Sequence, residues 1–591
     1  MEKWFVTTKK ADFEKWAREL QISPILARII RNRDLTRLDE VEKYLHGTLR
    51  DCYSPWLLKD MKGAVELIQD AIGRGIRIRV IGDYDVDGIC SSYILTKGLQ
   101  ILGAVVDTAI PHRIRDGYGL NENLIEEAKR DGVGMIVTCD NGIAAASQIQ
   151  LAMDYGIQVI VTDHHEVPFV IKETEQGTVK EEILPPAKAV IDPKQNGCGY
   201  PYPGICGGVV AYKVMAALAE KTGNDALLGC MDELLEFAAF ATVCDVMELR
   251  DENRILVKEG LKRLRKSHNL GLLALMEVNA IEPGKLNAYH LGFVLGPCLN
   301  ATGRLDTAKR ALELLQSKTK AEAMSAAAKL KELNDSRKTL TMKGVEQAFQ
   351  VIDSNHMNRD KVIVVYLPEV HESLAGIIAG RVREAYNHPV FVLTKGEDGV
   401  KGSGRSIEGY HMYEAMTEVK ELFSKYGGHA MAAGLSMEEK DIDTLRARLN
   451  ELCQLEEEDF IQKIHIDVPL PLEYGTEELV DQLELLEPFG VSNPKPLFAQ
   501  KNLVFTKGYK MGANKSFARF WVMTPQGTGK QLVYFGNLAA FEGFLDEKYG
   551  SGSAERLFEG RAKYEISVVY QLGKNTFRGN TEIQYIMQYY C

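Results

Sequence analysis

The chain of 591 residues has no CxxC pair, and its ten cysteines stand singly, as Cys139 and Cys244 do inside apolar segments. Such cysteines are typical of reduced thiols and exclude a disulfide framework or a zinc finger. No apolar run approaches the roughly 20 residues that span a bilayer. The first residues, Met1–Val6, lack the basic and apolar segments of a signal peptide. We therefore expect a cytoplasmic protein with no membrane partner.

Basic residues are outnumbered, with 71 Lys and Arg against 82 Asp and Glu, so the formal net charge is -11. The chain as a whole does not attract a polyanion, and any nucleic-acid site must be a local basic surface. Repeats and low-complexity segments are also missing. Hydrophobic residues make up 45% and charged residues 26%, ordinary values for a globular protein. At roughly 150 residues per domain, the length predicts about four domains.

Strand-like apolar runs alternate with helical patterns in the first half of the chain. The predicted strands are 76–81, 105–110, 135–138, 159–162 and 187–191. This βαβ rhythm predicts an α/β fold with a parallel sheet, whose ligands lie at the carboxyl ends of the strands.

The rest of the chain is predicted to form a connector and two further domains. A segment rich in Ala, Lys, Glu and Leu predicts one or two long connecting helices, and a smaller α/β block with strands at 362–367 and 390–393 follows. Short strands separated by Gly, Pro and Asn then predict a small β-barrel. The predicted domains are 1–305 (N-terminal segment and core), 306–355 (connecting helix), 356–455 (smaller α/β domain) and 456–591 (barrel).

Acidic residues follow the first predicted strand, where Asp83, Asp85 and Asp87 stand within five positions. These carboxylates repel one another, so either a bound cation neutralises them or they stand in a solvent-exposed acidic turn. A calcium loop requires a Glu at position 12 and flanking helices, whereas here a strand enters the turn.

Two more predicted strands end in the same way. Asp140 follows 135–138, and Asp163, His164 and His165 follow 159–162, while Asp245 comes after a separate apolar run. Taken singly, each of these could be a turn or a helix cap. Parallel strands, however, bring their carboxyl ends to one edge of a sheet. Carboxylates and imidazoles without thiolates are the donor set expected for Mn²⁺ or Mg²⁺.

These motifs resemble a known family. Residues 82–88, 140–142, 163–165 and 242–245 resemble, in order, the first four motifs of the DHH phosphoesterase superfamily. Within it the chain is similar to the RecJ family of bacterial single-strand-specific exonucleases. Residues 295–305 resemble the RecJ motif that follows the core, with Thr302 where Ala is common. Residues 401–406 and 427–434 resemble motifs of a DHHA1 domain. Residues 486–490 and 493–496 resemble the segment that precedes an oligonucleotide-binding (OB) fold in RecJ.

The resemblance implies roles for the site residues. One or two Mn²⁺ or Mg²⁺ ions would be held by six ligands, whose division between the ions stays open: Asp83, Asp85, Asp87, Asp140, His164 and Asp245. The ions would activate a water and neutralise charge on the phosphodiester. Asp163 and His165 would orient these ligands. The predicted catalytic set is Asp83, Asp85, Asp140, His164, His165 and Asp245.

A second set of residues suits phosphate. Ser403, Arg405 and His429 stand in Gly-rich segments, expected to be turns whose amides can approach an anion. With Arg304 they are assigned to the substrate backbone or its 5′ end. His371, after a strand and before a helix, is a further candidate phosphate site. Each motif alone could be an incidental Gly-rich connection.

Aromatic and basic side chains interleave in the predicted barrel, as single-strand binders require. About half of the rings are expected to be barrel core. They are Phe505, Tyr509, Phe517, Phe520, Trp521, Tyr534 and Phe535.

The function implied by the resemblance is metal-dependent 5′ to 3′ hydrolysis of single-stranded DNA to 5′-mononucleotides, in DNA repair and recombination. Single-stranded DNA is the expected partner, with a single-strand-binding protein and a helicase as candidate protein partners. Two alternatives stay open. One is a DHH phosphodiesterase acting on short RNA or cyclic dinucleotides, which the additional barrel disfavours, and the other is a non-catalytic replication scaffold, which the intact acidic motifs disfavour.

Overall fold

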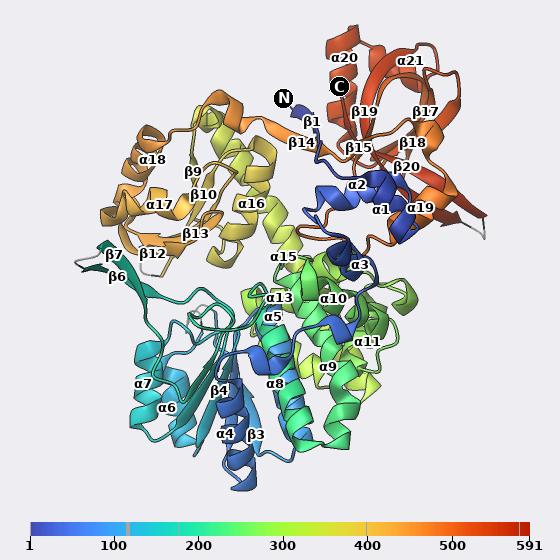
Figure 1. Cartoon of the computed structure of the whole chain (residues 1–591). Coiled ribbons are helices and arrows are strands. Elements are labelled where there is room, and N and C mark those ends of the chain that lie inside the picture. Colours follow the sequence, from blue (N-terminus) through green and yellow to red (C-terminus); the bar gives the residue numbers. More distant parts are fainter. Residues whose placement is uncertain (1, 114–118, 175–176, 398, 578–579) are drawn as a thin grey trace. The chain divides into compact units, whose positions relative to one another are not determined.

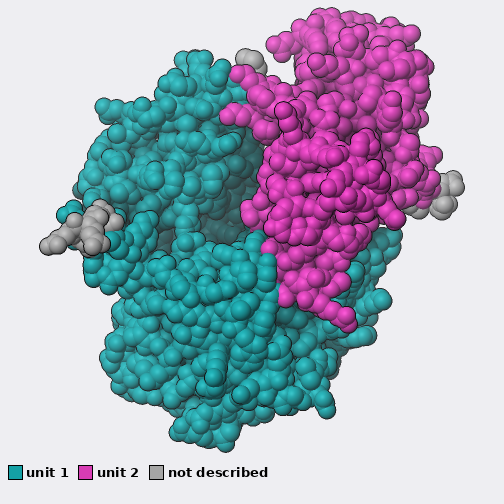
Figure 2. Space-filling view, in the orientation of Figure 1, with its two compact units in different colours: residues 1, 53–247, 259–462 teal, residues 2–52, 248–258, 463–591 magenta. Residues whose placement is uncertain are grey.

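A computed structural model describes residues 2–113, 119–174, 177–397, 399–577 and 580–591. The chain forms two compact units, shown in Figure 2. Unit 1 comprises Tyr53–Met247 and Glu259–Gln462, and unit 2 comprises Glu2–Cys52, Glu248–Lys258 and Lys463–Cys591. The domain boundaries expected from the sequence stay predictions. Within the described ranges, no helix has the length and apolar character needed to cross a membrane.

The predicted parallel sheet lies in unit 1 and is confirmed. Its five strands run in the order β3-β2-β4-β5-β8, and every neighbouring pair is parallel. The bounds are β2 (Ile78–Gly82), β3 (Val106–Ala109), β4 (Met135–Cys139), β5 (Gln158–Thr162) and β8 (Ala189–Ile191). The central strands are buried throughout because helices cover both faces.

Helices α5 (Val86–Ile101) and α8 (Gly207–Thr222) lie on one face of this sheet, and α6 (Glu122–Arg130) and α7 (Ala146–Asp154) on the other (Figure 1). A hairpin of β6 (Phe169–Thr174) and β7 (Gly177–Glu182) stands between β5 and β8 in the chain and pairs with no other described strand.

Helices continue unit 1 after the sheet. They include α9 (Asp225–Cys244), α11 (Leu270–Val278), α12 (Ala288–His290), a π-helical turn (Leu291–Leu295) and α13 (Gly296–Leu305). The predicted connecting helices are α14 (Lys309–Leu315) and α15 (Lys320–Ser354). Helix α15 begins in a capping box, in which the Thr319 hydroxyl accepts from the Glu322 amide and the Glu322 carboxylate accepts from the Thr319 amide.

The smaller α/β block of unit 1 is a mixed sheet in the order β12-β13-β11-β10-β9. Its strands are β9 (Ile363–Tyr366), β10 (Val390–Gly396), β11 (Gly399–Arg405), β12 (Phe423–Gly428) and β13 (Ala432–Met437), with helices α16 (Ala375–Tyr386), α17 (Met412–Thr417) and α18 (Ile442–Leu452).

The expectation that Ser403 and Arg405 stand in a turn is wrong, because both lie on strand β11. The glycines of this strand serve close packing. A Cβ on Gly402 would lie 2.4 Å from Leu393 Cδ2, and one on Gly404 would lie 2.3 Å from Met412 Sδ. His429 does lie in a turn, where its amide donates to the Ala432 carbonyl.

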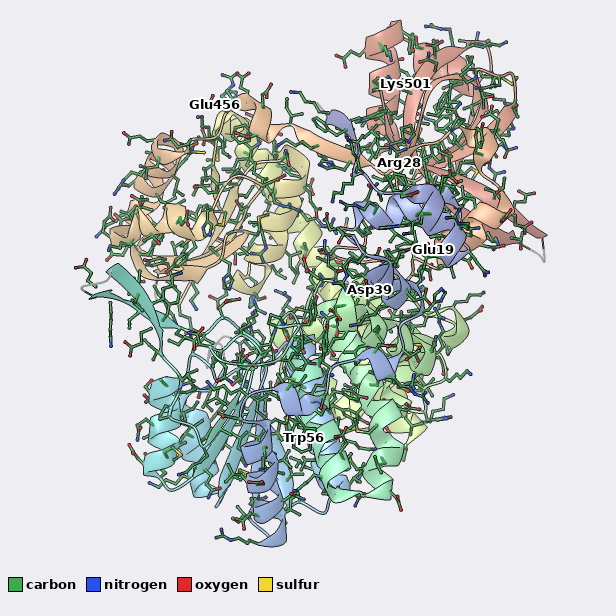
Figure 3. The ribbon with its side chains drawn as sticks, viewed as in Figure 1. Glu19, Arg28, Asp39, Trp56, Glu456 and Lys501 are labelled. Carbon is green, nitrogen blue, oxygen red and sulfur yellow. The ribbon has the colours of Figure 1, made fainter. Side chains whose placement is uncertain are left out.

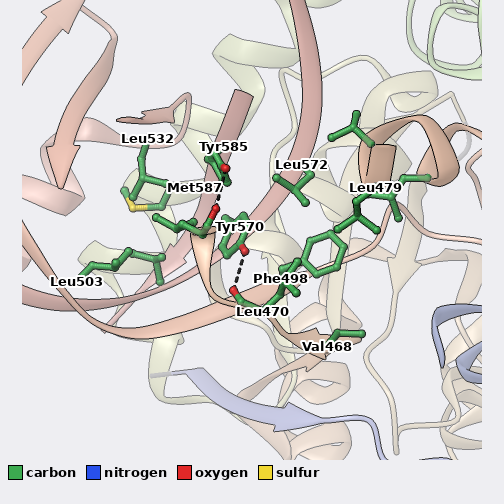
Figure 4. Packing of buried hydrophobic residues seen from close by; sticks show 14 of the residues in the cluster. Val468, Leu470, Leu479, Phe498, Leu503, Leu532, Tyr570, Leu572, Tyr585 and Met587 are labelled. Carbon is green, nitrogen blue, oxygen red and sulfur yellow. Dashed lines mark hydrogen bonds between the residues drawn. The ribbon is translucent and has the colours of Figure 1, made fainter. Parts of the chain in front are cut away.

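Unit 2 contains the predicted barrel. The strands β16 (Phe498–Met511), β17 (Phe517–Met523), β18 (Gly529–Tyr534), β20 (Asn580–Tyr590) and β19 (Tyr564–Phe577) follow one another, and pairing of β16 with β19 closes the barrel. Figure 4 shows its core, where Tyr570 is buried and its hydroxyl donates to the Leu470 carbonyl at 2.7 Å.

The helices of the first 52 residues share this hydrophobic core. They are α1 (Phe13–Leu20), α2 (Pro24–Asn32) and α3 (Leu38–His46). Trp16, Leu26 and Ile30 belong to the same buried cluster as Phe498. Charged side chains such as Glu19 and Lys501 are exposed (Figure 3).

The barrel aromatics divide as expected between core and surface. Phe505, Phe520 and Tyr534 are buried, whereas Tyr509 and Phe535 are 60% and 56% exposed.

Candidate metal centre and phosphate-binding residues

The carboxyl ends of β2, β4 and β5 bring the predicted acids and imidazoles together, because these three strands are adjacent in the sheet. Three groups have ligand atoms within 4.8 Å of one another and could hold a metal ion. They are Asp83, Asp85 and Asp140; Asp87, His164 and Asp245; and Asp140, His164 and His165. Asp245 enters from the C-terminal end of α9, where it is the residue that follows the last helical turn.

The ring of His164 faces the carboxylates. Its Nε2 lies 3.1 Å from Asp140 Oδ1, 3.5 Å from Asp87 Oδ2 and 3.7 Å from Asp245 Oδ2. Burial lowers the pKa of His164 below its ordinary value, so the neutral, metal-ligating form is favoured.

The acids repel one another in a buried site. Burial, followed by the charges of neighbouring aspartates, raises the pKa of Asp140 well above its ordinary value, and the same causes raise that of Asp245 to about 8. Asp83 Oδ1 and His164 Nδ1 are buried with no hydrogen-bond partner among the described groups. Hard oxygen donors, one neutral imidazole and unmet polar atoms fit a divalent cation such as Mn²⁺ or Mg²⁺.

Asp87 is placed differently from the other acids. Its two oxygens accept the amides of Gly207 (2.8 Å) and Gly208 (2.6 Å) at the start of α8. A Cβ on Gly207 would lie 2.7 Å from Asp140 Cβ and 3.1 Å from Asp87 Oδ2, so only glycine lets α8 approach the centre this closely. Asp87 therefore fixes α8 beside the centre.

Asp163 holds both histidines in place. Its Oδ1 accepts the His164 amide at 2.8 Å and lies 2.8 Å from His165 Nδ1, while Oδ2 accepts the Ile143 amide at 2.9 Å. Burial alone would raise the pKa of Asp163, but the hydrogen bond and charge of His165 hold it below its ordinary value. Burial alone would lower the pKa of His165, yet its hydrogen bond to Asp163 raises it to about 9.

This pair gives a prediction with a definite sign. Asp163→Asn removes the charge that stabilises the His165 imidazolium, so the pKa of His165 should fall from about 9 to below the ordinary histidine value, where burial dominates. Because ligand-orienting partners are typically worth 10- to 100-fold, activity should fall by about that factor. An NMR titration of the His165 ring measures the pKa, and a value unchanged near 9 would contradict this assignment.

Three arginines lie beside the centre: Arg113, Arg304 and Arg405. The Arg113 guanidinium stacks 4.7 Å from the Tyr84 ring centre. Burial, followed by the positive charges of Arg113 and Arg337, lowers the pKa of Arg304 to about 10. Burial also lowers the pKa of Arg405. In the part of the chain that the structure describes, no carboxylate forms an ion pair with Arg304 or Arg405. Partly buried cations that lack a counter-ion suit an anionic ligand.

The predicted phosphate residues converge in unit 1. Arg304 Nη1 donates to the Ser373 carbonyl at 2.6 Å, and the Ser373 hydroxyl lies 2.8 Å from His371 Nδ1. At the start of α16, a Cβ on Gly376 would lie 2.8 Å from Arg405 Nη2 and 3.4 Å from Ser403 Oγ. Arg304, His371, Ser403 and Arg405 are thus brought together around this helix start, whereas His429 is exposed in its hairpin turn.

Two charged residues near the candidate site were not predicted from the sequence, although each of them follows a predicted strand. Arg113 comes after β3, and Asp192 comes directly after β8. Asp192 is fully buried, its Oδ2 has no described partner, and burial together with the Asp163 charge raises its pKa to about 8. Both residues could have been predicted from their position at the carboxyl end of a parallel strand, which is the feature that identified Asp140.

Comparison with known proteins agrees with this architecture. Three family models match the chain: the DHH family, N-terminal domain, at residues 77–242, the DHHA1 domain at 359–455, and the RecJ OB domain at 466–589. The core sheet with its Asp-His-His triplet and the mixed sheet after it thus define a DHH phosphoesterase with a DHHA1 domain.

Relatives narrow this class. The chain is 35% identical to the single-stranded-DNA-specific exonuclease RecJ of Bacillus subtilis, over 87% of this chain and 63% of that protein. It is 33% identical to the exonuclease of the same name from Escherichia coli, over 96% of each. The structure of RecJ with Mn²⁺ from Thermus thermophilus matches with a TM-score of 0.81 and 27% identity, over all of this chain and 79% of that one.

The chain belongs to the RecJ family. The resemblance inferred from the motifs is confirmed, and the Thermus relative was solved with Mn²⁺ and with Mg²⁺, the two ions that the motifs predict.

Proposed function

We propose that this chain is a metal-dependent exonuclease that degrades single-stranded DNA from its 5′ end to 5′-mononucleotides. The observation that carries the proposal is the joint presence, within unit 1, of a buried carboxylate–imidazole cluster and of two partly buried arginines, Arg304 and Arg405, without a described acidic partner. Hydrolysis of the phosphodiester next to a terminal phosphate requires the acidic cluster to hold the metal and the arginines to bind the terminal phosphate. Repair and recombination, a single-strand-binding protein and a helicase belong to this proposal as its cellular setting.

Each residue has a part in the proposed reaction. Six residues would hold the metal: Asp83, Asp85, Asp87, Asp140, His164 and Asp245. Bound Mn²⁺ or Mg²⁺ supplies charge neutralisation at the phosphodiester and a more acidic water. Asp163 keeps the two imidazoles oriented through its contacts with His164 and His165. Asp87 fixes the start of α8 through Gly207 and Gly208.

The arginines would set where cleavage occurs. Arg304 and Arg405, with the Ser403 hydroxyl, offer charged and neutral donors near the amino end of α16. A 5′-phosphate held there would place the next phosphodiester at the acidic cluster. This arrangement would favour cleavage of the phosphodiester next to the 5′ end of a strand over cleavage of an internal phosphodiester.

The test combines metal, substrate and polarity. Hydrolysis should require Mn²⁺ or Mg²⁺, stop in excess EDTA, and not be supported by Ca²⁺, whose larger and more flexible coordination suits compact hydrolytic sites poorly. A 5′-labelled single strand should release labelled mononucleotide at once, while a 3′-labelled strand should shorten gradually and a blunt duplex should resist. Degradation from the 3′ end, or preference for a cyclic dinucleotide over long strands, would refute the proposal.

A variant of the phosphate-binding residues sharpens the test. Arg405→Met should remove most of the preference for a 5′-phosphorylated strand over a 5′-hydroxyl strand, raising KM for the former by about 10- to 100-fold, because hydrogen bonds to charged groups contribute about 1.5–3 kcal/mol. Arg448→Met, on helix α18 of the same domain, is the matched control, since the Arg448 guanidinium pairs with Glu421. An unchanged preference in Arg405→Met would remove Arg405 from the site.

A further inference from the structure

One helical segment runs past the candidate metal centre from residue 288 to residue 305, through α12, the π-helical turn and α13. Most of its surface is buried. Five of the residues that keep some exposure recur every three or four positions and so lie along one face: Tyr289, Phe293, Pro297, Asn300 and Arg304. His290, Gly292, Val294 and Leu305 also keep some exposure. This face leads from an aromatic pair at one end to Arg304 at the other.

The aromatic pair is unusually open. Tyr289 is 63% and Phe293 is 70% exposed. Their rings are stacked, with centres 5.0 Å apart and planes 22° apart. Ring pairs four residues apart stabilise a helix only slightly, and that effect does not need both rings in solvent. The π-helical turn that carries Phe293 is a feature often found at functional sites.

The middle of the same segment packs against the residues of the centre. The Cys244 thiol, next to Asp245, lies 3.5 Å from the Leu291 carbonyl. A Cβ on Gly296 would lie 2.4 Å from Cys244 Sγ, and one on Gly303 would lie 2.7 Å from the Tyr84 carbonyl, next to Asp83 and Asp85. Residues next to the acids thus contact the segment from Leu291, between the two rings, to Gly303, next to Arg304.

We infer that Tyr289 and Phe293, at the opposite end of this segment from Arg304, form a base-stacking platform for the substrate strand that enters the metal centre. This inference rests on the proposed function and adds the path of the strand. The terminal phosphate lies at Arg304, the scissile bond lies at the acids, and the bases of the next nucleotides stack on the exposed rings. Rings stack on any base, so the platform grips the strand without reading its sequence.

The length of the segment limits which nucleotides are involved. Tyr289 and Arg304 are separated by about 22 Å at 1.5 Å per helical residue. At a spacing of at least 3.4 Å per nucleotide, the platform lies within about six nucleotides of the terminal phosphate. The bases that contact it should therefore be found among the first six.

Abasic scanning tests this path. A set of 5′-phosphorylated 12-mers, each with one abasic site at positions 1 to 6, is titrated against the full chain in EDTA, with binding followed by fluorescence anisotropy. In the wild type, one or two positions should each lose about 5- to 100-fold in affinity when the base is missing. The double variant Tyr289→Ala/Phe293→Ala should bind the intact strand more weakly by a similar factor and should no longer respond to those abasic sites.

Two variants serve as controls. Leu228→Ala, at a 47% exposed apolar residue near the opposite end of α9 from Asp245, should keep the wild-type profile. Phe293→Trp should keep the profile because it keeps a ring. The inference is overturned if the double variant, folded by circular dichroism, binds the intact strand like the wild type or retains its abasic profile. If the wild type binds no single strand at all, the proposed function fails instead.

Discussion

Asp140→Ala is expected to reduce hydrolysis of single-stranded DNA by about three orders of magnitude or more. Asp140 belongs to two of the three groups of potential ligands, with Asp83 and Asp85 in one and with His164 and His165 in the other. Its loss therefore affects the whole centre. Charge stabilisation by a bound metal supplies several kcal/mol in the transition state, and about 4 kcal/mol corresponds to a factor of 10³. Turnover and metal content of the purified variant measure the effect.

Folding and strand binding should survive this substitution. Burial and the charges of the neighbouring aspartates disfavour the charged form of Asp140 and raise its pKa, so removing the carboxylate takes a repelling charge out of the site. Arg304 and Arg405 are untouched. Asp140 has a φ of 59°, which Asn tolerates better than Ala, so Asp140→Asn separates loss of charge from backbone strain. Asp154→Ala, at the exposed end of α7, is the control. Wild-type turnover with unchanged metal content would contradict the assignment.

The metal centre could be predicted from the sequence because it depends on a topological rule. Apolar runs identified the strands, and parallel strands direct their carboxyl ends to one edge. The sheet order then placed β2, β4 and β5 side by side, with Asp83, Asp140 and His164 at that edge. Asp245 needed only the end of an apolar run, which is the end of helix α9.

Other features depend on contacts that no local pattern contains. The glycines of β11 suggest a turn by composition, but they are strand residues because Leu393 and Met412 leave no room for a side chain. The amphipathic helix α2 shows that Leu26 and Ile30 face a core. It does not show that this core is shared with the barrel, whose Phe498 stands 472 residues after Leu26 (498 − 26).

The same limitation applies to Arg254, in the short segment 248–258 of unit 2. It is 1% exposed, and its guanidinium lies 3.8 Å from the Tyr44 ring centre. It donates to four carbonyl oxygens at 2.8–3.0 Å, those of Tyr44, Leu485, Leu486 and Glu487. Burial lowers its pKa below the ordinary arginine value. This one side chain therefore joins α3 to the loop that precedes the barrel.

Arg254→Met should destabilise unit 2 by about 3 kcal/mol or more. The substitution relieves the cost of burying a cation, which is several kcal/mol. It also removes the guanidinium donor from the carbonyls of Tyr44, Leu485 and Glu487, at about 1–3 kcal/mol each, and it removes the contact with the Tyr44 ring. The Leu486 carbonyl keeps the Asn493 side-chain amide as a donor at 2.8 Å. The loss of hydrogen bonds is the larger effect because several of them depend on this one guanidinium. Arg254→Lys keeps the charge but not the planar fork, so its effect should be intermediate. Urea unfolding followed by barrel fluorescence measures the change, with Lys262→Met, at an exposed residue of the helix Asp251–Leu264, as control. Unfolding of Arg254→Met at the wild-type urea concentration would show that these carbonyls find other donors.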